Sequence, residues 1–310
     1  MSGELLEVRN LRKYFPLIGK EVVKAVCDVS FSLERGRTFS LVGESGCGKT
    51  TCGRTLLGLY EKTGGTVLFE GRDTSTFTPK ESRAFHRRAQ MIFQDPYSCL
   101  DPRMNVESII LEGRKEFFKE GKGERHEKVK ELLSLAGLPE SFSACFPHEL
   151  SGGQRQRVGI ARALAVEPDL IVCDEPVAAL DVSIQAQVIN LFLELQEKKG
   201  LSYLFISHDL SIVRHISDEI GVMYLGAIVE KAPAEELFSN PLHPYTKALF
   251  SAVRRESGRI KLKGEMPSPV SHSGGCRFSS RCPFASEECR RTCPSLRELS
   301  PGHSVACHKT

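Results

Sequence analysis

Near the start of the chain, eight consecutive residues have the types and spacing needed to bind phosphate: Gly43-Glu44-Ser45-Gly46-Cys47-Gly48-Lys49-Thr50. They match G-x-x-x-x-G-K-[ST], the pattern of the phosphate-binding loop. Glycines let the backbone curl so that successive N–H groups point at one anion. Lys49 is expected to reach the β- and γ-phosphates, Thr50 to hold Mg²⁺, and Thr51 to make a further phosphate contact. We therefore predict a nucleoside triphosphate site.

The flanking residues supply the context that this motif requires. The apolar run Thr38–Val42 predicts a buried strand, and Thr51–Leu59 predicts the first turns of a helix. That helix would add the positive end of its dipole to the anion site. The alternative is a glycine-rich turn with a surface lysine, which the complete match in a strand–loop–helix context disfavours.

Two acids follow a second buried run. Leu170–Cys173 is apolar and predicts a strand, and Asp174 and Glu175 stand at its end. Asp174 is placed to hold Mg²⁺, usually through water, and Glu175 is the candidate base that polarises an attacking water. Loop acids without a role are the alternative, which the preceding phosphate loop makes less favourable.

Two other predicted strands also end in polar side chains. Ala89–Phe93 is followed by Gln94, whose neutral amide can bind Mg²⁺ or position a water without adding charge. Tyr203–Ser207 is followed by His208, which could bond a γ-phosphate. A glutamine or histidine alone in such a place is more often structural, so both assignments depend on the acids above.

A second helix start also has the features of an anion site. Ser151 is a natural N-cap, and Gly152 and Gly153 free the backbone before Gln154. One nucleotide uses one phosphate loop, so the second site needs a reason. The simplest reason is that it completes the nucleotide site of another subunit.

Bulk composition limits the classes of protein to consider. The chain has 310 residues, of which 40% are hydrophobic and 26% charged, as in an ordinary globular protein with one large core or two domains. A net charge of +3 gives no case for nucleic-acid binding as the main activity. No signal peptide is expected, and apolar runs are too short to cross a bilayer, so membrane association should depend on a partner.

The remaining elements suggest an α/β core with additions. Leu5–Val8 is predicted as an edge strand that pairs with Val22–Leu33 in an antiparallel layer, with a turn near Gly19 between them. Tyr14 and Phe15, just ahead of the phosphate loop, could stack on a base or belong to the core.

Helices are predicted in three further places. Pro79–Arg88 forms one, Val106–Gly137 forms a charged helical insertion with a break at Gly121, and Val182–Lys198 forms a third.

Taken in order, these stretches resemble the ATPase subunit of ABC transporters. The resemblance runs from Leu5 to about residue 252 and implies a P-loop NTPase fold: a mixed sheet with an antiparallel β layer, and a helical subdomain at about 95–160. It implies a domain boundary between a nucleotide-binding domain, 1–252, and a loop-rich C-terminal extension, 253–310. It also implies a head-to-tail dimer with two ATP molecules, and a permease helix that docks near Gln94.

The resemblance assigns roles to individual positions. The matching positions are Gly43–Thr51 for the Walker A loop, Leu150–Gln154 for the signature, Asp174 for the Walker B acid, Glu175 for the catalytic glutamate, Asp181 for the D-loop, His208 for the switch histidine, and Phe15 (with Tyr14 as the alternative) for the adenine-stacking aromatic.

Three stretches resemble the peptide-importer group within this family: Gln94-Asp95-Pro96 through Arg103, Asp181–Val188 and His243–Thr246. The region around Tyr97 resembles the second ATPase of those importers, although Ala179 stands where the group more often has serine. The implied partners are a second ATPase subunit, identical or not, two integral membrane permease subunits and, indirectly, an extracytoplasmic solute-binding protein. The implied location is the cytoplasmic face of the membrane. A soluble ABC ATPase acting on nucleic acid or ribosomes, and a redox-sensing ATPase, are the alternatives.

Eleven cysteines are unevenly distributed, and five crowd the C-terminal end. The three intervals between Cys276, Cys282, Cys289 and Cys307 are five, six and seventeen residues. Structural zinc sites usually contain a close pair, which only Cys289 and Cys293 would supply, whereas wide spacing on loops suits a [4Fe–4S] cluster. The peptide-importer tail is similar and is taken to bind such a cluster, with Cys307 favoured as fourth ligand over Cys293. Zinc and free thiols remain alternatives.

Overall fold

A computed structural model of the chain describes residues 3–17, 21–95, 97–251, 260, 262, 264, 267–268, 270 and 274–310. The predicted turn at Gly19, Pro96 of the importer-like stretch and the expected boundary at 252–253 lie outside these residues. The chain divides into two compact units. The first contains Met1–Thr76 and Phe205–Thr310, and the second contains Phe77–Leu204.

The first unit begins with a four-stranded antiparallel sheet of order β2-β1-β4-β5. Its β1 is hydrogen-bonded along both sides, with Leu6 opposite Leu33 of β2 and Phe69 of β4. The prediction that Leu5–Val8 is an edge strand is therefore wrong, because a later strand covers its free side. The bounds are β1 Glu4–Pro16, β2 Val22–Glu34, β4 Gly64–Phe69 and β5 Arg72–Asp73, followed by a 3-10 turn at Thr74–Thr76.

A second sheet in this unit carries the phosphate loop. Its strands there follow the order β11-β12-β10-β9-β3, and β3 is parallel to β9, with Val42 opposite Val222. Every residue of β3 is buried, as its apolar run predicts. The loop therefore leaves the sheet where β9 also ends. The bounds are β3 Thr38–Val42, β9 Glu219–Tyr224, β10 Ala227–Pro233, β11 Arg297–Ser300 and β12 His303–Val305.

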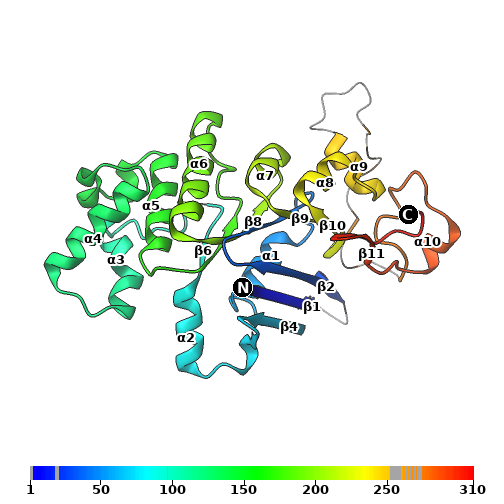
Figure 1. The fold of residues 1–310 in the computed structure, drawn as a ribbon, viewed down its shortest axis with the longest axis horizontal. Coiled ribbons are helices and arrows are strands. Elements are labelled where there is room, and N and C mark those ends of the chain that lie inside the picture. The colour runs from blue at the N-terminus through cyan, green and yellow to red at the C-terminus, as the bar shows by residue number, and fades with distance from the viewer. Residues whose placement is uncertain are drawn as a thin grey trace. The chain divides into compact units, whose positions relative to one another are not determined.

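Five helices among the described residues belong to the first unit, and each is labelled in Figure 1. The helix after the loop starts earlier than predicted, because Gly48 adopts the left-handed conformation at its N-cap. A buried cluster that includes Val42, Tyr224, Tyr245, Phe250 and Phe278 joins strands, helices and C-terminal extension. The helix bounds are α1 Lys49–Leu56, α7 Leu210–Ile216, α8 Ala234–Ser239, α9 Pro244–Ser251 and α10 Glu287–Arg291.

The second unit combines parallel strands with a helical group. β6 is parallel to β7, with Ile92 opposite Cys173. The helices α3 and α4 form the predicted insertion at 106–137, with the break at Gly121 just before α4, and both contact α5 (Figure 1). β8, Ser202–Ser207, leads from this unit into the first. The other bounds are α2 Pro79–Arg88, β6 Ala89–Ile92, α3 Val106–Phe117, α4 Lys122–Leu135, 3-10 turns at Glu140–Ala144 and Pro147–Glu149, α5 Gly152–Leu164, β7 Leu170–Asp174 and α6 Val182–Lys199.

The C-terminal extension does not stand apart from the first unit. Its β12 pairs with β10, where Val305 is opposite Glu230, and so the extension lengthens the sheet. Phe278, only 1% exposed, lies in the buried cluster. The tail has too few apolar residues to form a core of its own, but its few large side chains pack into the core of the first unit. Across the described helices, none combines the length and apolar character needed to cross a membrane.

Candidate functional site

The phosphate loop connects β3 to α1 and is held by its own lysine. Lys49 is 5% exposed, and its Nζ donates to the carbonyl oxygens of Gly43, at 2.8 Å, and Glu44, at 3.2 Å. The Cys47 N–H donates to the Glu44 carbonyl at 3.3 Å. Burial raises the pKa of the Cys47 thiol, although nearby Lys49 acts in the opposite direction. The thiol therefore stays neutral beside an anion site.

Two glycines of the loop have no room for a side chain. Gly43 has a φ of 152°, and a Cβ there would lie 2.2 Å from the carbonyl oxygen of Met223. Gly48 has a φ of 108°, and its Cβ would lie 2.1 Å from the carbonyl oxygen of Ala25. The N-cap of α1 is Gly48, which has no side chain to cap the first N–H groups. This local geometry fits a bound phosphate.

Other predicted residues of the first unit are placed as follows. Phe15 is half-buried; its ring meets Tyr60 edge to face at 5.4 Å, and the Lys13 ammonium lies 4.6 Å from the ring centroid. Tyr14 is also half-buried, and its backbone N–H donates to Thr63. His208 is exposed just after β8, where Asp209 caps α7. Ser45 and Gly46 are exposed, and Thr50 and Thr51 lie half-buried in the first turn of α1.

The second unit brings together two predicted residues that are distant in sequence. The Gln94 side-chain amide donates to Glu175 Oε2 at 3.1 Å. This contact follows from the parallel pairing of β6 and β7, which ends both strands at one edge. Asp174 is fully buried at the end of β7, and Glu175 follows with a φ of 46°. A left-handed φ is strained for a residue with a side chain, and such strain is common at functional positions.

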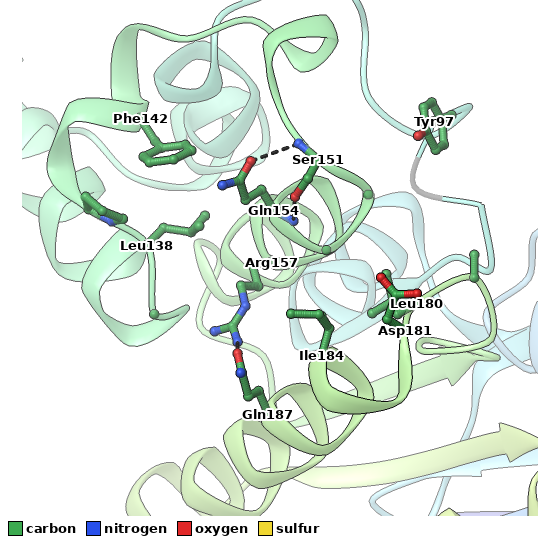
Figure 2. Close-up of a pocket in the computed structure, with 15 residues that line it drawn as sticks. Tyr97, Leu138, Phe142, Ser151, Gln154, Arg157, Leu180, Asp181, Ile184 and Gln187 are labelled. Atoms are coloured by element: carbon green, nitrogen blue, oxygen red, sulfur yellow. Dashed lines mark hydrogen bonds between the residues drawn. The ribbon is translucent and has the colours of Figure 1, made fainter.

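The predicted signature lines one side of a cavity in the second unit. Ser151 caps α5: its hydroxyl accepts from the Gln154 N–H at 3.3 Å, and the Gln154 side chain accepts from the Ser151 N–H at 2.8 Å. Figure 2 shows this start of α5 in a cavity of about 640 Å³ that is also lined by Asp181, at the N-cap of α6, and Leu138. Gly152 and Gly153 line the same cavity. The structure thus brings the signature and the D-loop acid together.

Sequence reasoning missed two residues that hold the phosphate loop. Arg281 of the extension pairs with both oxygens of Glu44 at 3.0 Å. Tyr245 accepts a hydrogen bond from the Glu44 backbone N–H at 2.9 Å. Tyr245 lies in the importer-like stretch His243–Thr246, which signalled its importance but not its contact. No sequence signal marks Arg281.

The tail cysteines do not form a metal site in this structure. Among the residues it describes, which include all five tail cysteines, no group of three or more His, Cys, Asp or Glu side chains could hold a metal ion. Burial raises the pKa of Cys276 to about 11, whereas a hydrogen bond from Ser286 lowers the pKa of Cys289. The geometry of the described residues does not support a [4Fe–4S] cluster or zinc.

Known proteins resemble this chain along nearly its whole length. The oligopeptide transport ATP-binding protein AppF of Bacillus subtilis (strain 168) is 53% identical over 318 residues, which cover 98% of this chain and 97% of the relative. The putative oligopeptide transport ATP-binding protein YkfD of the same organism is 52% identical, with 98% and 95% covered.

Structures and family models agree with these relatives. A dimeric structure of a post-hydrolysis state of an ATP-binding cassette bound to ADP and Pi is 28% identical, with a TM-score of 0.68, over 74% of this chain and 98% of that one. The ABC transporter family matches residues 26–178, and the C-terminal region of oligopeptide/dipeptide transporters matches residues 229–289. Together with the phosphate loop, the capped signature and the Gln94–Glu175 pair, these similarities show that the chain belongs to the ABC transporter ATP-binding proteins of the oligopeptide/dipeptide importer type.

Proposed function

We propose that this chain is the ATPase subunit that powers import of oligopeptides, dipeptides or a similar small solute. The observation that carries the proposal is the 53% identity, over 98% of the chain, to an oligopeptide transport ATP-binding protein. The match of residues 229–289 to the oligopeptide/dipeptide transporter C-terminal region supports the same solute class.

The phosphate loop has the chemistry to bind the triphosphate. Lys49 now bonds two carbonyls of its own loop, and it would exchange these partners for β- and γ-phosphate oxygens. Thr50, Asp174 and Gln94 offer a hydroxyl, a carboxylate and an amide oxygen, the hard donors that suit Mg²⁺. When bound, Mg²⁺ would neutralise charge on the phosphates. Phe15, or Tyr14, would stack on the adenine.

The strand-end residues would carry the hydrolysis step. Glu175 would orient the attacking water and accept its proton, and Gln94 already donates a hydrogen bond to this carboxylate. His208 would bond the γ-phosphate and offset its charge. Phosphoryl transfer needs positioning and charge neutralisation more than covalent chemistry, and these side chains supply both.

The signature is proposed to serve a second subunit. Ser151, Gly152, Gly153 and Gln154 would contact the triphosphate held by the partner, and Asp181 would lie at the same junction. The capped start of α5 supports this, since an exposed helix N-terminus suits an anion. The partner is a second ATPase subunit, identical or different. Closure around two ATP molecules would move two membrane permease subunits, and a solute-binding protein outside the membrane would deliver the solute. The chain would sit peripherally on the cytoplasmic face.

We also propose that residues 1–252 act as a nucleotide-binding domain and residues 253–310 as a separate functional extension. Within the extension, the [4Fe–4S] cluster on Cys276, Cys282, Cys289 and Cys307 stays a prediction that rests on sequence resemblance. After anaerobic purification of the full chain, about four iron and four sulfide atoms per chain and a brown protein with broad visible absorption would support the cluster. A colourless protein with stoichiometric zinc would replace the cluster by zinc, and a metal-free protein would leave free thiols.

Co-purification tests the transport function against action on nucleic acid or ribosomes. The relatives do not favour that alternative. We expect the tagged chain, expressed in its native host and extracted in detergent, to retain two integral membrane subunits. The Gly152→Asp variant, which disables only the signature, should retain them too. Recovery with ribosomes or nucleic acid and without membrane subunits would contradict the proposal.

A further inference from the structure

The phosphate loop carries a carboxylate at its second position. Glu44 follows Gly43 directly, and its side chain is 29% exposed. A negative charge on a loop that binds triphosphate is unfavourable in itself, since like charges repel. The chain must therefore neutralise this carboxylate or accept weaker nucleotide binding.

The neutralising group comes from the far end of the chain. Arg281 Nη1 lies 3.0 Å from both Glu44 Oε1 and Oε2, across 237 residues of sequence. The Arg281 side chain is only 8% exposed. An exposed ion pair contributes little, but burial removes the water that would screen this charge. Both residues belong to the first unit.

The arginine is fixed by a turn whose aromatic residue is in the core. The backbone N–H groups of Arg281 and Cys282 both donate to the Phe278 carbonyl, at 3.0 and 2.9 Å. Phe278 is 1% exposed, and its ring lies 5.5 Å from the ring of Tyr245. The guanidinium also lies 5.9 Å from the ring of Tyr224. Arg281 is therefore anchored by its turn and by the rings of Phe278 and Tyr224, in addition to its ion pair with Glu44.

The loop backbone is held from the same cluster. Tyr245 is fully buried on α9, and its hydroxyl accepts the Glu44 N–H at 2.9 Å. The Gly226 N–H, in the turn after β9, donates to the Cys47 carbonyl at 2.8 Å. Side-chain and backbone contacts thus fix Glu44 together.

We propose that Arg281 is a positioning residue for the phosphate loop: it fixes the Glu44 carboxylate and cancels its charge, so that the C-terminal extension sets the affinity for ATP. The proposal rests on the ATPase function proposed above. It gives the extension a role in nucleotide binding that does not depend on a metal. In this proposal Arg281 acts on the nucleotide through Glu44.

The test measures the dissociation constant of a slowly hydrolysed fluorescent ATP analogue for the full chain. Arg281→Met keeps the side-chain stem and leaves Glu44 uncompensated, so we expect about 2- to 30-fold weaker binding. This is the range for repulsion between two unit charges, the Glu44 carboxylate and a phosphate group, about 8 Å apart at effective dielectric constants of about 80 down to 20. The double variant Arg281→Met/Glu44→Gln should recover most of the lost affinity. Raising the salt concentration should reduce the difference in dissociation constant between Arg281→Met and the unmodified chain, because salt screens the charge repulsion.

Controls separate this role from general stabilisation. Arg291→Ala removes an exposed arginine of the same extension and should leave the affinity unchanged. If Arg281→Met weakens binding because packing is lost, adding Glu44→Gln should not restore the affinity. If it weakens binding because the Glu44 charge repels the nucleotide, adding Glu44→Gln should restore it. If thermal melting shows that Arg281→Met does not fold, Arg281→Gln makes the same charge change with a polar side chain.

Three results would overturn the inference: unchanged affinity in Arg281→Met, no rescue by Glu44→Gln, or a Glu44→Gln single variant that binds as weakly as Arg281→Met. An unmodified chain that binds no ATP analogue would instead refute the ATPase function itself. The two failures are therefore distinguishable.

Discussion

Glu175 combines a strained backbone with a defined hydrogen bond. Its φ of 46° turns the chain directly after β7, and the Gln94 amide holds one of its carboxylate oxygens. A base that must orient one water benefits from having few accessible orientations. The local strain is thus consistent with the catalytic role proposed for this residue.

Replacing Glu175 by glutamine should separate binding from hydrolysis. The amide is isosteric but cannot accept a proton, so we expect phosphate release to fall by about 10²- to 10⁴-fold. ATP-dependent dimerisation, followed by size-exclusion chromatography, should persist. Glu194→Gln, a change on the exposed face of α6, is the control and should keep full turnover. Near-normal hydrolysis by Glu175→Gln would remove this residue from the role.

His243 makes the stability of the first unit depend on pH. The ring is 1% exposed, and burial lowers its pKa from 6.5 to about 4. Its Nδ1 accepts the Tyr245 N–H at 3.1 Å, which requires a neutral ring nitrogen. In the unfolded chain this imidazole binds a proton below about 6.5, whereas the folded chain does not until about 4. Folding therefore becomes less favourable as the pH falls through this window.

We expect His243 to lower the free energy of unfolding by up to about 1.4 kcal/mol for each pH unit between 6.5 and 4. Urea unfolding at several pH values measures it. His243→Asn, which offers an oxygen acceptor but does not titrate, should show a correspondingly flatter dependence even if it is less stable overall. Identical slopes in the two proteins would show that another group is responsible.

At the scale of elements, α5 begins with a reciprocal cap that leaves its first glycine open. Ser151 and Gln154 satisfy each other's backbone N–H groups. A Cβ on Gly152 would meet no atom within 4 Å, whereas one on Gly153 would lie 2.8 Å from Ile184 Cγ2. Gly152 is therefore a place where charge can be added without disturbing this chain's own packing.

Gly152→Asp should abolish turnover without loss of stability. A carboxylate in the first turn of a helix is stabilising by about 0.3–1 kcal/mol, but it would repel a partner's triphosphate. The matched control is Gly123→Asp, which adds the same charge to the first turn of α4, again into open space. Thermal melting of both variants measures their stability, and phosphate release measures their turnover. Full activity in Gly152→Asp would disprove the anion site at the signature.

At the scale of the whole molecule, each chain has one phosphate loop and one signature. The loop lies in the first compact unit and the signature in the second. A similar ATP-binding cassette is known as a dimer bound to ADP and Pi. If the signature serves a neighbouring chain, a single copy holds two incomplete halves of different sites.

The turnover of the isolated ATPase should consequently rise with its own concentration. At saturating ATP, phosphate release per chain should be low in dilute solution and should approach a plateau as dimers form. Adding excess Gly152→Asp chain to unmodified chain at the plateau concentration should lower phosphate release per total chain, because each mixed dimer keeps one complete site and each variant dimer has none. A rate per chain that does not change with dilution would mean that one chain suffices, or that the dimer never dissociates, and sedimentation would tell these apart.

Local patterns accounted for much of the fold. The bounds of α2 and the start of α3 match their predictions, because a threonine and an asparagine cap these helices. The edge assignment of β1 failed, since the strand that covers its second side follows the phosphate loop in sequence. The hairpin β11–β12 was not foreseen, because a short polar segment becomes a strand only when a sheet edge is available.

The sequence alone determined the chemistry of the phosphate loop, the strand-end acid pair and the capped signature, because each depends on residues that are neighbours along the chain. Tertiary structure decided which distant groups meet: Gln94 with Glu175 across 81 residues, and Arg281 with Glu44 across 237. Such contacts are set by strand pairing and by the burial of rings such as Phe278, which depend on the whole core and leave no mark in local spacing.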